Sequence, residues 1–187
     1  MTTVNGKQAK GVSIRVSGHV MNTEAKPLEG VKVEIWQACQ AGSYNHPKDT
    51  NPAPRDPNFE YYSSIRTDSN GYYSFKTIIP GPYPADDHWM RPPHIHYKVS
   101  HEGHKPFITQ LYFDGNSFLN QEISVVGGKS VTGKVINHLN ELDLMLNKIP
   151  EASRPRLIVP FLQGDMMPEP NGVFNICLKE AANTALT

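Results

Sequence analysis

Cysteine is scarce in this sequence: the two cysteines, Cys39 and Cys177, lie far apart among 187 residues. Proteins held together by disulfides are usually short and rich in cysteine, so this chain does not belong to that class. We expect both thiols to be free and buried, because an unpaired cysteine packs like a small apolar side chain.

Long apolar runs are also lacking. The first 20 residues contain no run of about seven apolar residues, as a signal peptide requires, and no segment is apolar enough to span a bilayer. Positive charge is not in excess either, because 18 Lys and Arg residues balance 18 Asp and Glu residues. Nucleic acids and membrane surfaces both require a concentrated positive face. We therefore expect a cytoplasmic protein with neither partner, whose low net charge does not oppose assembly into a homo-oligomer.

Proline and glycine, in contrast, are abundant, with 16 and 14 residues spread along the whole chain. Frequent proline and glycine along the whole chain are typical of all-β proteins with many turns. Residues 38–60 show no periodicity and hold four prolines, each of which disfavours helix in the residue before it. A loop of this length inside a compact domain is usually functional or disordered, and its aromatic content argues against full disorder.

Alternation of polar and apolar residues predicts several β-strands. Residues 13–20 and 31–37 alternate clearly, and the turn-rich link between them predicts a hairpin or a Greek-key corner. Residues 68–71 predict another hairpin, because Gly71 can adopt positive φ between two β-rich runs. Further strands are expected over residues 94–99, 107–113, 156–162 and 173–178.

One helix is predicted over residues 135–149, where apolar residues recur at near-helical spacing and Pro150 would end it. The length fits one domain, residues 1–187, in which residues 1–12 form an extended arm. About eight short strands, long loops and at most one short helix predict an all-β fold. The expected architecture is an antiparallel Greek-key β-sandwich of transthyretin type.

The stretch RPPHIH is the first candidate for chemistry. His94 and His96 lie two residues apart on a predicted strand, so both imidazoles point to one side of the sheet. Two convergent imidazoles can bind a transition metal, although most pairs of this spacing are surface or packing residues. A hydrolase that adds a carboxylate such as Asp114 is one alternative. His101 and His104 lie in a polar turn and are expected to be solvated.

Tyrosines near this pair offer a different donor. Tyr83 lies in a proline-rich turn 11 residues before His94, and Tyr44 lies in the long loop. Phenolate is a hard, charged oxygen donor that suits Fe(III) better than Zn(II) or Cu(I). Composition alone does not separate these two from tyrosines with a core or interface role. That ordinary role is expected for Tyr61, Tyr62, Tyr72, Tyr73, Tyr97 and Tyr112.

Several ordered motifs give the chain a family resemblance. The segments GVKVEIWQACQAGSYNH, RTDSNGYYSFKTIIPGPYP, RPPHIH and ITQLYFDGN resemble those of the intradiol ring-cleavage dioxygenases, in the same order. The chain is most similar to the iron-bearing chain of the protocatechuate 3,4-dioxygenases, mainly over residues 13–116. The resemblance implies a non-haem Fe(III) held by Tyr44, Tyr83, His94 and His96.

The same resemblance implies a reaction. The enzyme would use O2 to cleave a catechol-type ring between its two hydroxylated carbons, giving a cis,cis-muconate, in the catabolism of aromatic compounds. Tyr44 would be both ligand and general base. Arg91 would stabilise negative charge on the substrate, unless it is a surface residue paired with Asp86 or Asp87. Gln110 would contact the substrate or an iron ligand, unless it is an ordinary polar strand residue.

Departures from the family pattern bear on the substrate and on the subgroup of the family to which the chain is similar. The chain lacks the helical N-terminal extension of the catechol, chlorocatechol and hydroxyquinol enzymes, which points away from those groups. The acidic Asp86 after PGPYP predicts a pocket that disfavours a ring carboxylate. A non-catalytic binding module of transthyretin type is the alternative from another class. It would share the fold, but it would not explain the paired tyrosine and histidine motifs.

Overall fold

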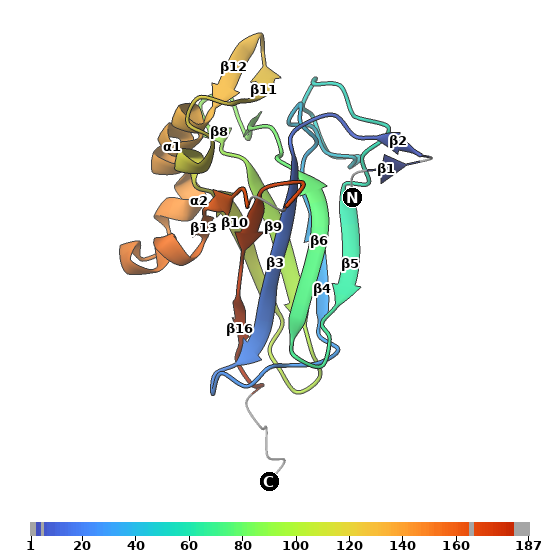
Figure 1. Ribbon diagram of the computed structural model, residues 1–187. Coiled ribbons are helices and arrows are strands. Elements are labelled where there is room, and N and C mark those ends of the chain that lie inside the picture. The colour runs from blue at the N-terminus through green and yellow to red at the C-terminus, as the bar shows by residue number, and fades with distance from the viewer. Residues whose placement is uncertain (1–2, 5, 165–166, 182–187) are drawn as a thin grey trace.

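The computed structural model describes residues 3–4, 6–164 and 167–181, which form two packed β-sheets (Figure 1). The first sheet has the order β13 (Ile158–Val159), β10 (Phe107–Phe113), β9 (His94–Ser100), β4 (Lys32–Trp36) and β5 (Tyr62–Arg66). The second contains β14 (Phe161–Leu162), β15 (Asn171–Val173), β3 (Ser13–Asn22), β16 (Ile176–Leu178) and β6 (Tyr72–Ile78), which pairs with β3. The predicted all-β sandwich is confirmed.

The core lies between these sheets, because each strand alternates inward and outward residues. On β9 the inward residues Ile95, Tyr97 and Val99 are fully buried. The residues between them therefore point to the outer face of the first sheet. His94 and His96 share that outer face, as the sequence predicted.

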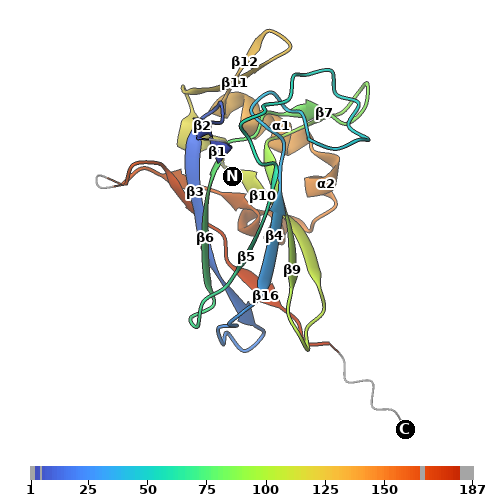
Figure 2. The same cartoon turned by 90° about the vertical axis from the view of Figure 1, so that its right-hand side faces the viewer.

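Smaller elements accompany the two sheets. The two-stranded pairs are β1 (Thr3–Val4) with β2 (Lys7–Gln8), β7 (Tyr83–Pro84) with β8 (Met90–Arg91), and β11 (Glu122–Val126) with β12 (Lys129–Thr132). The helices are η1 (Gly115–Phe118), α1 (Gly133–Leu142), α2 (Leu144–Asn147) and η2 (Glu151–Arg156). The loop between β4 and β5 lies at the same end as β7 (Figure 2). None of the helices in the described ranges has the length and apolar character needed to cross a membrane.

The hairpin predicted at residues 68–71 is wrong. The turn itself forms, since Gly71 donates its N–H to the carbonyl of Asp68 at 2.9 Å. Its flanking strands separate, however: β5 pairs with β4 in the first sheet, and β6 pairs with β3 in the second. β3 and β4 also lie in different sheets, so they do not form a hairpin. The link between them is therefore the Greek-key corner, the other predicted alternative. Local turn chemistry sets a chain reversal, whereas burial of the strand faces selects the pairing partner.

The single helix predicted over residues 135–149 is divided in the structure. α1 begins at Gly133 and ends at Leu142, and Asp143 then adopts an extended backbone with φ −69° and ψ 118°. α2 begins directly afterwards, with Asp143 as its N-cap. The periodicity of the apolar residues continues across this break, so it could not reveal the break.

The late strands and one cysteine also differ from expectation. Pro160, which has no N–H to donate, divides residues 156–162 into β13 and β14 of opposite sheets. Residues 173–178 are likewise split between β15 and β16. The β13, β15 and β16 strands pair in parallel with β10 or β3, so the sandwich is mixed rather than purely antiparallel.

Both cysteines are free, but only Cys39 is buried, because Cys177 is exposed on β16.

Candidate metal centre

A row of polar and aromatic side chains crosses the outer face of the first sheet. His96 on β9 lies directly opposite Trp36 on β4 and Gln110 on β10. His94 lies opposite Tyr112 in the neighbouring row. Opposite residues on one face have Cβ atoms within about 5.5 Å, so the strand register brings these side chains together.

The two imidazoles converge through their Nε2 atoms, which lie 3.1 Å apart. His94 Nδ1 lies 2.7 Å from the carbonyl oxygen of Pro92. A carbonyl only accepts, so Nδ1 carries the proton and Nε2 presents a lone pair. Contacts of this kind orient metal-binding histidines in proteins. His94 is therefore held in the tautomer that a metal ion at Nε2 requires.

Both imidazoles are neutral at neutral pH. Burial, followed by the nearby Arg91 cation, lowers the pKa of His96 to about 4. The same two causes, together with His96, lower the pKa of His94 well below its ordinary value. Neutral imidazole is the form that binds metal ions.

Two tyrosines adjoin the histidine pair. The Tyr83 hydroxyl lies 3.4 Å from His94 Nε2. The Tyr44 ring packs edge-on against Tyr83, with centroids 5.3 Å apart, and its centroid lies 6.2 Å from that of His96. The Tyr44 hydroxyl is buried and has no hydrogen-bond partner among the described residues. Burial, followed by the neighbouring Tyr83, raises the pKa of Tyr44 well above its usual range, so this phenol keeps its proton in the absence of a cation.

This donor set fits a hard metal cation. A buried polar atom without a partner is rare and requires a reason, and a cation beside Tyr44 would satisfy its oxygen and ionise the phenol. Neutral imidazoles and phenolates together suit Fe(III). The structure brings together the four residues that were predicted as iron ligands, Tyr44, Tyr83, His94 and His96. Their role as ligands stays a prediction.

Two glycines allow the loops that carry the tyrosines to approach each other. Gly42 and Gly81 both donate their N–H to the carbonyl of Cys39, at 2.9 and 3.0 Å. A Cβ atom at Gly81 would overlap the carbonyl oxygen of Gln40, and one at Gly42 would overlap that of Pro82. A side chain at either position would therefore force the two loops apart.

Replacing Gly81 with alanine is expected to weaken both the fold and the site. The obstructing atom belongs to the backbone, so the loops must move, and overpacking of this kind costs about 1–3 kcal/mol. Thermal unfolding would report the lost stability, and iron titration would report weaker binding. Gly164→Ala is the control, because the nearest atom to its new Cβ belongs to the Met167 side chain, at 3.5 Å. Equal iron affinity in the two variants would contradict this account of the loops.

Arg91 is buried beside the site, with a side chain only 7 % exposed. Its Nε donates to Asp143 Oδ2 at 3.0 Å, and its Nη2 donates to Gln110 Oε1 at 2.8 Å. The surface alternative, in which Arg91 pairs with Asp86 or Asp87, is therefore wrong. A proposed role in stabilising substrate charge remains compatible with this position.

Gln110 connects Arg91 to the histidines. Its Oε1 accepts from Arg91 and also from the hydroxyl of Tyr112, at 2.7 Å. The amide nitrogen therefore lies on the other side, 3.3 Å from His96 Nδ1. Gln110 thus contacts a candidate ligand directly, and its role in the reaction stays a prediction.

Two members of this network were not recognised from the sequence. Tyr112 was expected in the core or an interface and is buried, but its hydroxyl also accepts from Arg91 Nη2 at 3.0 Å, which ties it to the site. Its position two residues after Gln110 was the available signal, because such residues share a face. Asp143 is fully buried at the break between α1 and α2. No local pattern marks it, since its partner Arg91 lies 52 positions away in the chain.

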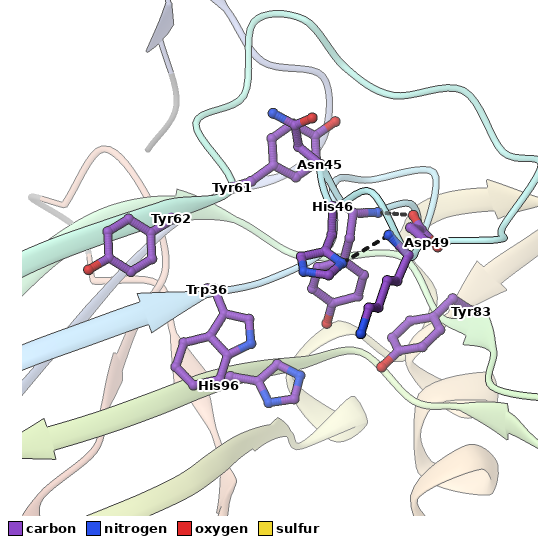
Figure 3. Close-up of a pocket in the computed structure, with 10 residues that line it drawn as sticks. Trp36, Asn45, His46, Asp49, Tyr61, Tyr62, Tyr83 and His96 are labelled. Carbon is purple, nitrogen blue, oxygen red and sulfur yellow. Dashed lines mark hydrogen bonds between the residues drawn. The ribbon is translucent and has the colours of Figure 1, made fainter.

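A cavity of about 470 Å³ opens beside the histidine row (Figure 3). Trp36 forms part of its wall and stacks on His96, with ring centroids 4.9 Å apart and planes 3° apart. The lining residues are Trp36, Tyr44, Asn45, His46, Lys48, Asp49, Tyr61, Tyr62, Tyr83 and His96. Tyr61 is buried in the core, as expected, and also contributes to the cavity wall, whereas Tyr62 is exposed at the cavity. This largely aromatic wall suits a flat aromatic ligand.

Asp86 does not line this cavity, and its predicted effect on a ring carboxylate stays a prediction. It is exposed in the turn between β7 and β8, where its carboxylate accepts the N–H of His88 at 2.8 Å. The charged residues of the cavity wall are instead Lys48 and Asp49. Both belong to the loop that carries Tyr44.

The hydrolase alternative has no support in this geometry. Within the described ranges, no group of three or more His, Cys, Asp or Glu residues is placed to hold a metal. Asp114 instead caps η1, accepting a backbone N–H at 2.9 Å. His101 and His104 lie in the turn beyond the other end of β9, with Nδ1 atoms 3.3 Å apart.

A β-sandwich with a tyrosine and histidine cluster beside an aromatic cavity defines a class of proteins with a candidate metal centre. A family model described as "Dioxygenase" matches residues 1–155. The chain belongs to the intradiol ring-cleavage dioxygenase family, as the resemblance of its motifs implied.

Known relatives and one solved structure agree with this assignment. The chain is 36% identical over 163 residues to the protocatechuate 3,4-dioxygenase beta chain of Burkholderia cepacia, covering 84% of this chain and 60% of that one. It is 35% identical over 141 residues to a catechol 1,2-dioxygenase of Candida albicans, covering 68% and 44%. The dioxygenase domain of a carbohydrate-binding fusion protein from Streptomyces sp. SirexAA-E superposes with a TM-score of 0.58 at 25% identity, covering 92% of this chain and 83% of that one. The chain thus spans about half the length of the curated relatives it matches.

Proposed function

We propose that the chain is a non-haem Fe(III) dioxygenase that cleaves a catechol-type ring with O2 between its two hydroxylated carbons, giving a cis,cis-muconate. The observation that carries this proposal is the packing of two neutral imidazoles against two phenols, one of which has a buried hydroxyl without a partner among the described residues. The ion would be held by Tyr44, Tyr83, His94 and His96. The aromatic wall of the cavity supports the same assignment.

When bound, Fe(III) would act as a Lewis acid that draws electron density from the catecholate, so that a ring carbon can react with O2. The protein's own groups would prepare the substrate. Tyr44 would accept a proton from one ring hydroxyl at its Oη atom. Trp36, fixed by its stacking on His96, would form a flat wall for the ring. Arg91 Nη1, which makes no hydrogen bond to a described residue, would stabilise negative charge on the reacting ring.

Oxygen uptake by the iron-loaded protein tests this proposal. Catechol, protocatechuate, hydroxyquinol and substituted catechols would be compared, and the product would be identified by its spectrum. We expect uptake with at least one of these compounds and a muconate as product. A semialdehyde product, or no uptake with any of them, would contradict the proposal.

The charges of the cavity favour a substrate with an anionic ring substituent. Lys48 lines the cavity and forms no ion pair with a described residue. The neighbouring Asp49 is engaged elsewhere, because its carboxylate accepts the backbone N–H groups of Tyr44, at 2.6 Å, and Asn51, at 3.1 Å. A ring carboxylate, as in protocatechuate, would find its counter-charge in the Lys48 ammonium group.

Replacing Lys48 with methionine is expected to raise the KM for protocatechuate about fivefold, the effect of losing one solvent-accessible ion pair. The KM for unsubstituted catechol is expected to stay the same. Lys105→Met, in the turn at the other end of the sandwich, is the control and should change neither value. An equal change for both substrates in Lys48→Met would rule out recognition of the substituent by this lysine.

A further inference from the structure

Asp143 holds a buried carboxylate in the short break between α1 and α2. Its side chain is fully buried, and Oδ1 accepts the N–H of Leu146 at 2.8 Å, which caps α2. A neutral asparagine or serine could cap a helix equally well. The capping role alone therefore does not explain a charged group in the interior, where an ionised carboxylate is costly unless it is paired.

The charge of Asp143 is paired with Arg91. Oδ2 accepts from Arg91 Nε at 3.0 Å, and Oδ1 lies 3.3 Å from Nη2, so one carboxylate faces one edge of the guanidinium. The side chains are 7 % and 0 % exposed. Such two-point contacts fix the plane and rotation of a guanidinium group, which a single contact does not.

Gln110 and Tyr112 complete the restraint on the same edge. Nη2 donates to Gln110 Oε1 at 2.8 Å and to the Tyr112 hydroxyl at 3.0 Å. Nε and Nη2 are therefore fully engaged, while Nη1 makes no hydrogen bond to a described residue. Arg91 also lies directly opposite Tyr83 in the β7–β8 pair, which places it next to the candidate metal ligands.

We propose that Asp143 is a positioning residue that fixes the Arg91 guanidinium so that Nη1 remains available to the substrate anion. The inference rests on the proposed function of this site. It assigns to the helix break a part in the reaction, since Asp143 contacts Arg91 from the position at which the helix is interrupted. A continuous helix would require Asp143 to leave the extended conformation it now adopts.

Asp143→Asn tests this role because it keeps an oxygen for the Leu146 N–H but removes the charge. We expect kcat to fall roughly 10- to 100-fold, the usual effect of losing a residue that orients a functional group. Iron content and the visible spectrum should be unchanged, because no candidate ligand is altered. The matched control is Glu169→Gln, which neutralises another buried carboxylate, paired with Arg15 at 3.0 Å and Lys76 at 3.2 Å in the second sheet. It should lower thermal stability without lowering kcat.

A double variant separates positioning from general damage. If Asp143 acts through Arg91, Arg91→Ala combined with Asp143→Asn should be no slower than Arg91→Ala alone. If the two substitutions each lowered kcat independently, so that their effects multiplied in the double variant, the inference would be overturned. A kcat in Asp143→Asn equal to that of Glu169→Gln would also overturn it. Asp143→Glu, which keeps the charge but displaces it by one methylene, is used if the asparagine variant unfolds. A normal kcat in that folded variant would also overturn the inference.

A measurement without iron or substrate keeps this inference distinct from the proposed function. In the metal-free protein, NMR can follow the Nε–H group of each arginine. The Nε–H group of Arg91 should be protected from exchange with solvent. We expect exchange to be more than tenfold faster in Asp143→Asn and unchanged in Glu169→Gln. Equal protection in all three proteins would refute the positioning role even if ring cleavage is observed. If instead no catechol is cleaved while protection is lost as expected, only the proposed function fails.

Discussion

Replacing His94 with alanine is expected to abolish iron binding and, with it, ring cleavage. His94 is fully buried, its Nδ1 is fixed on the carbonyl of Pro92, and its Nε2 faces both His96 and Tyr83. Losing a residue that merely orients a ligand weakens metal binding by about 10- to 100-fold, so losing the donor itself should exceed that. Iron content after loading and oxygen uptake with catechols would measure the two effects.

A second pair of histidines in the same chain supplies the control. His101 and His104 also approach each other, with Nδ1 atoms 3.3 Å apart, but neither ring has a hydrogen bond or ring contact with a tyrosine in the described part of the chain. His104→Ala should therefore leave iron content and turnover unchanged. If His94→Ala kept a full complement of iron, or if His104→Ala lost it, the assignment of the metal to the outer face of the first sheet would be wrong.

The sequence predicted those parts of the fold that depend on local pattern. Alternation along residues 94–99 predicted that His94 and His96 share one side of the sheet, and the structure places them on its outer face, opposite the buried Ile95, Tyr97 and Val99. The turn ending at Gly71 was also recognised, because its chemistry is local. The partner of each strand was not, since pairing depends on which faces are buried together in the complete sandwich.

In the candidate site, too, local features could be predicted from the sequence and contacts between distant segments could not. Spacing indicated only that His94 and His96 share one side of a strand. Their predicted role as ligands, and the separation of Tyr44 and Tyr83 from the other tyrosines, came from the family resemblance. Asp143 could not be found at all. It meets Arg91 through the packing of a helix break against β8, a contact between distant segments that no local pattern encodes.

Tyr44→Phe is expected to separate metal binding from substrate activation. The hydroxyl of Tyr83 lies 3.4 Å from His94 Nε2, but that of Tyr44 has no hydrogen-bond partner among the described residues, which leaves it free to exchange a proton with the substrate. Removing a positioned general base lowers rates by about 100- to 10,000-fold. We therefore expect kcat/KM for catechols to fall within that range. The variant should retain iron and a weakened visible absorption, because the Tyr83 phenolate remains to give charge transfer to the metal.

Tyr62→Phe is the matched control, because Tyr62 lines the same cavity but donates its hydroxyl to Glu34 at 2.8 Å, away from the histidines. It should keep both the colour and the turnover of the unmodified protein. Tyr83→Phe should instead lose more iron than Tyr44→Phe, since Tyr83 contacts His94 directly. Turnover by Tyr44→Phe at the unmodified rate would show that the substrate loses its protons to another group. In that case the buried, unpartnered hydroxyl would serve the metal alone, and the base would have to be sought among the other polar groups of the cavity wall.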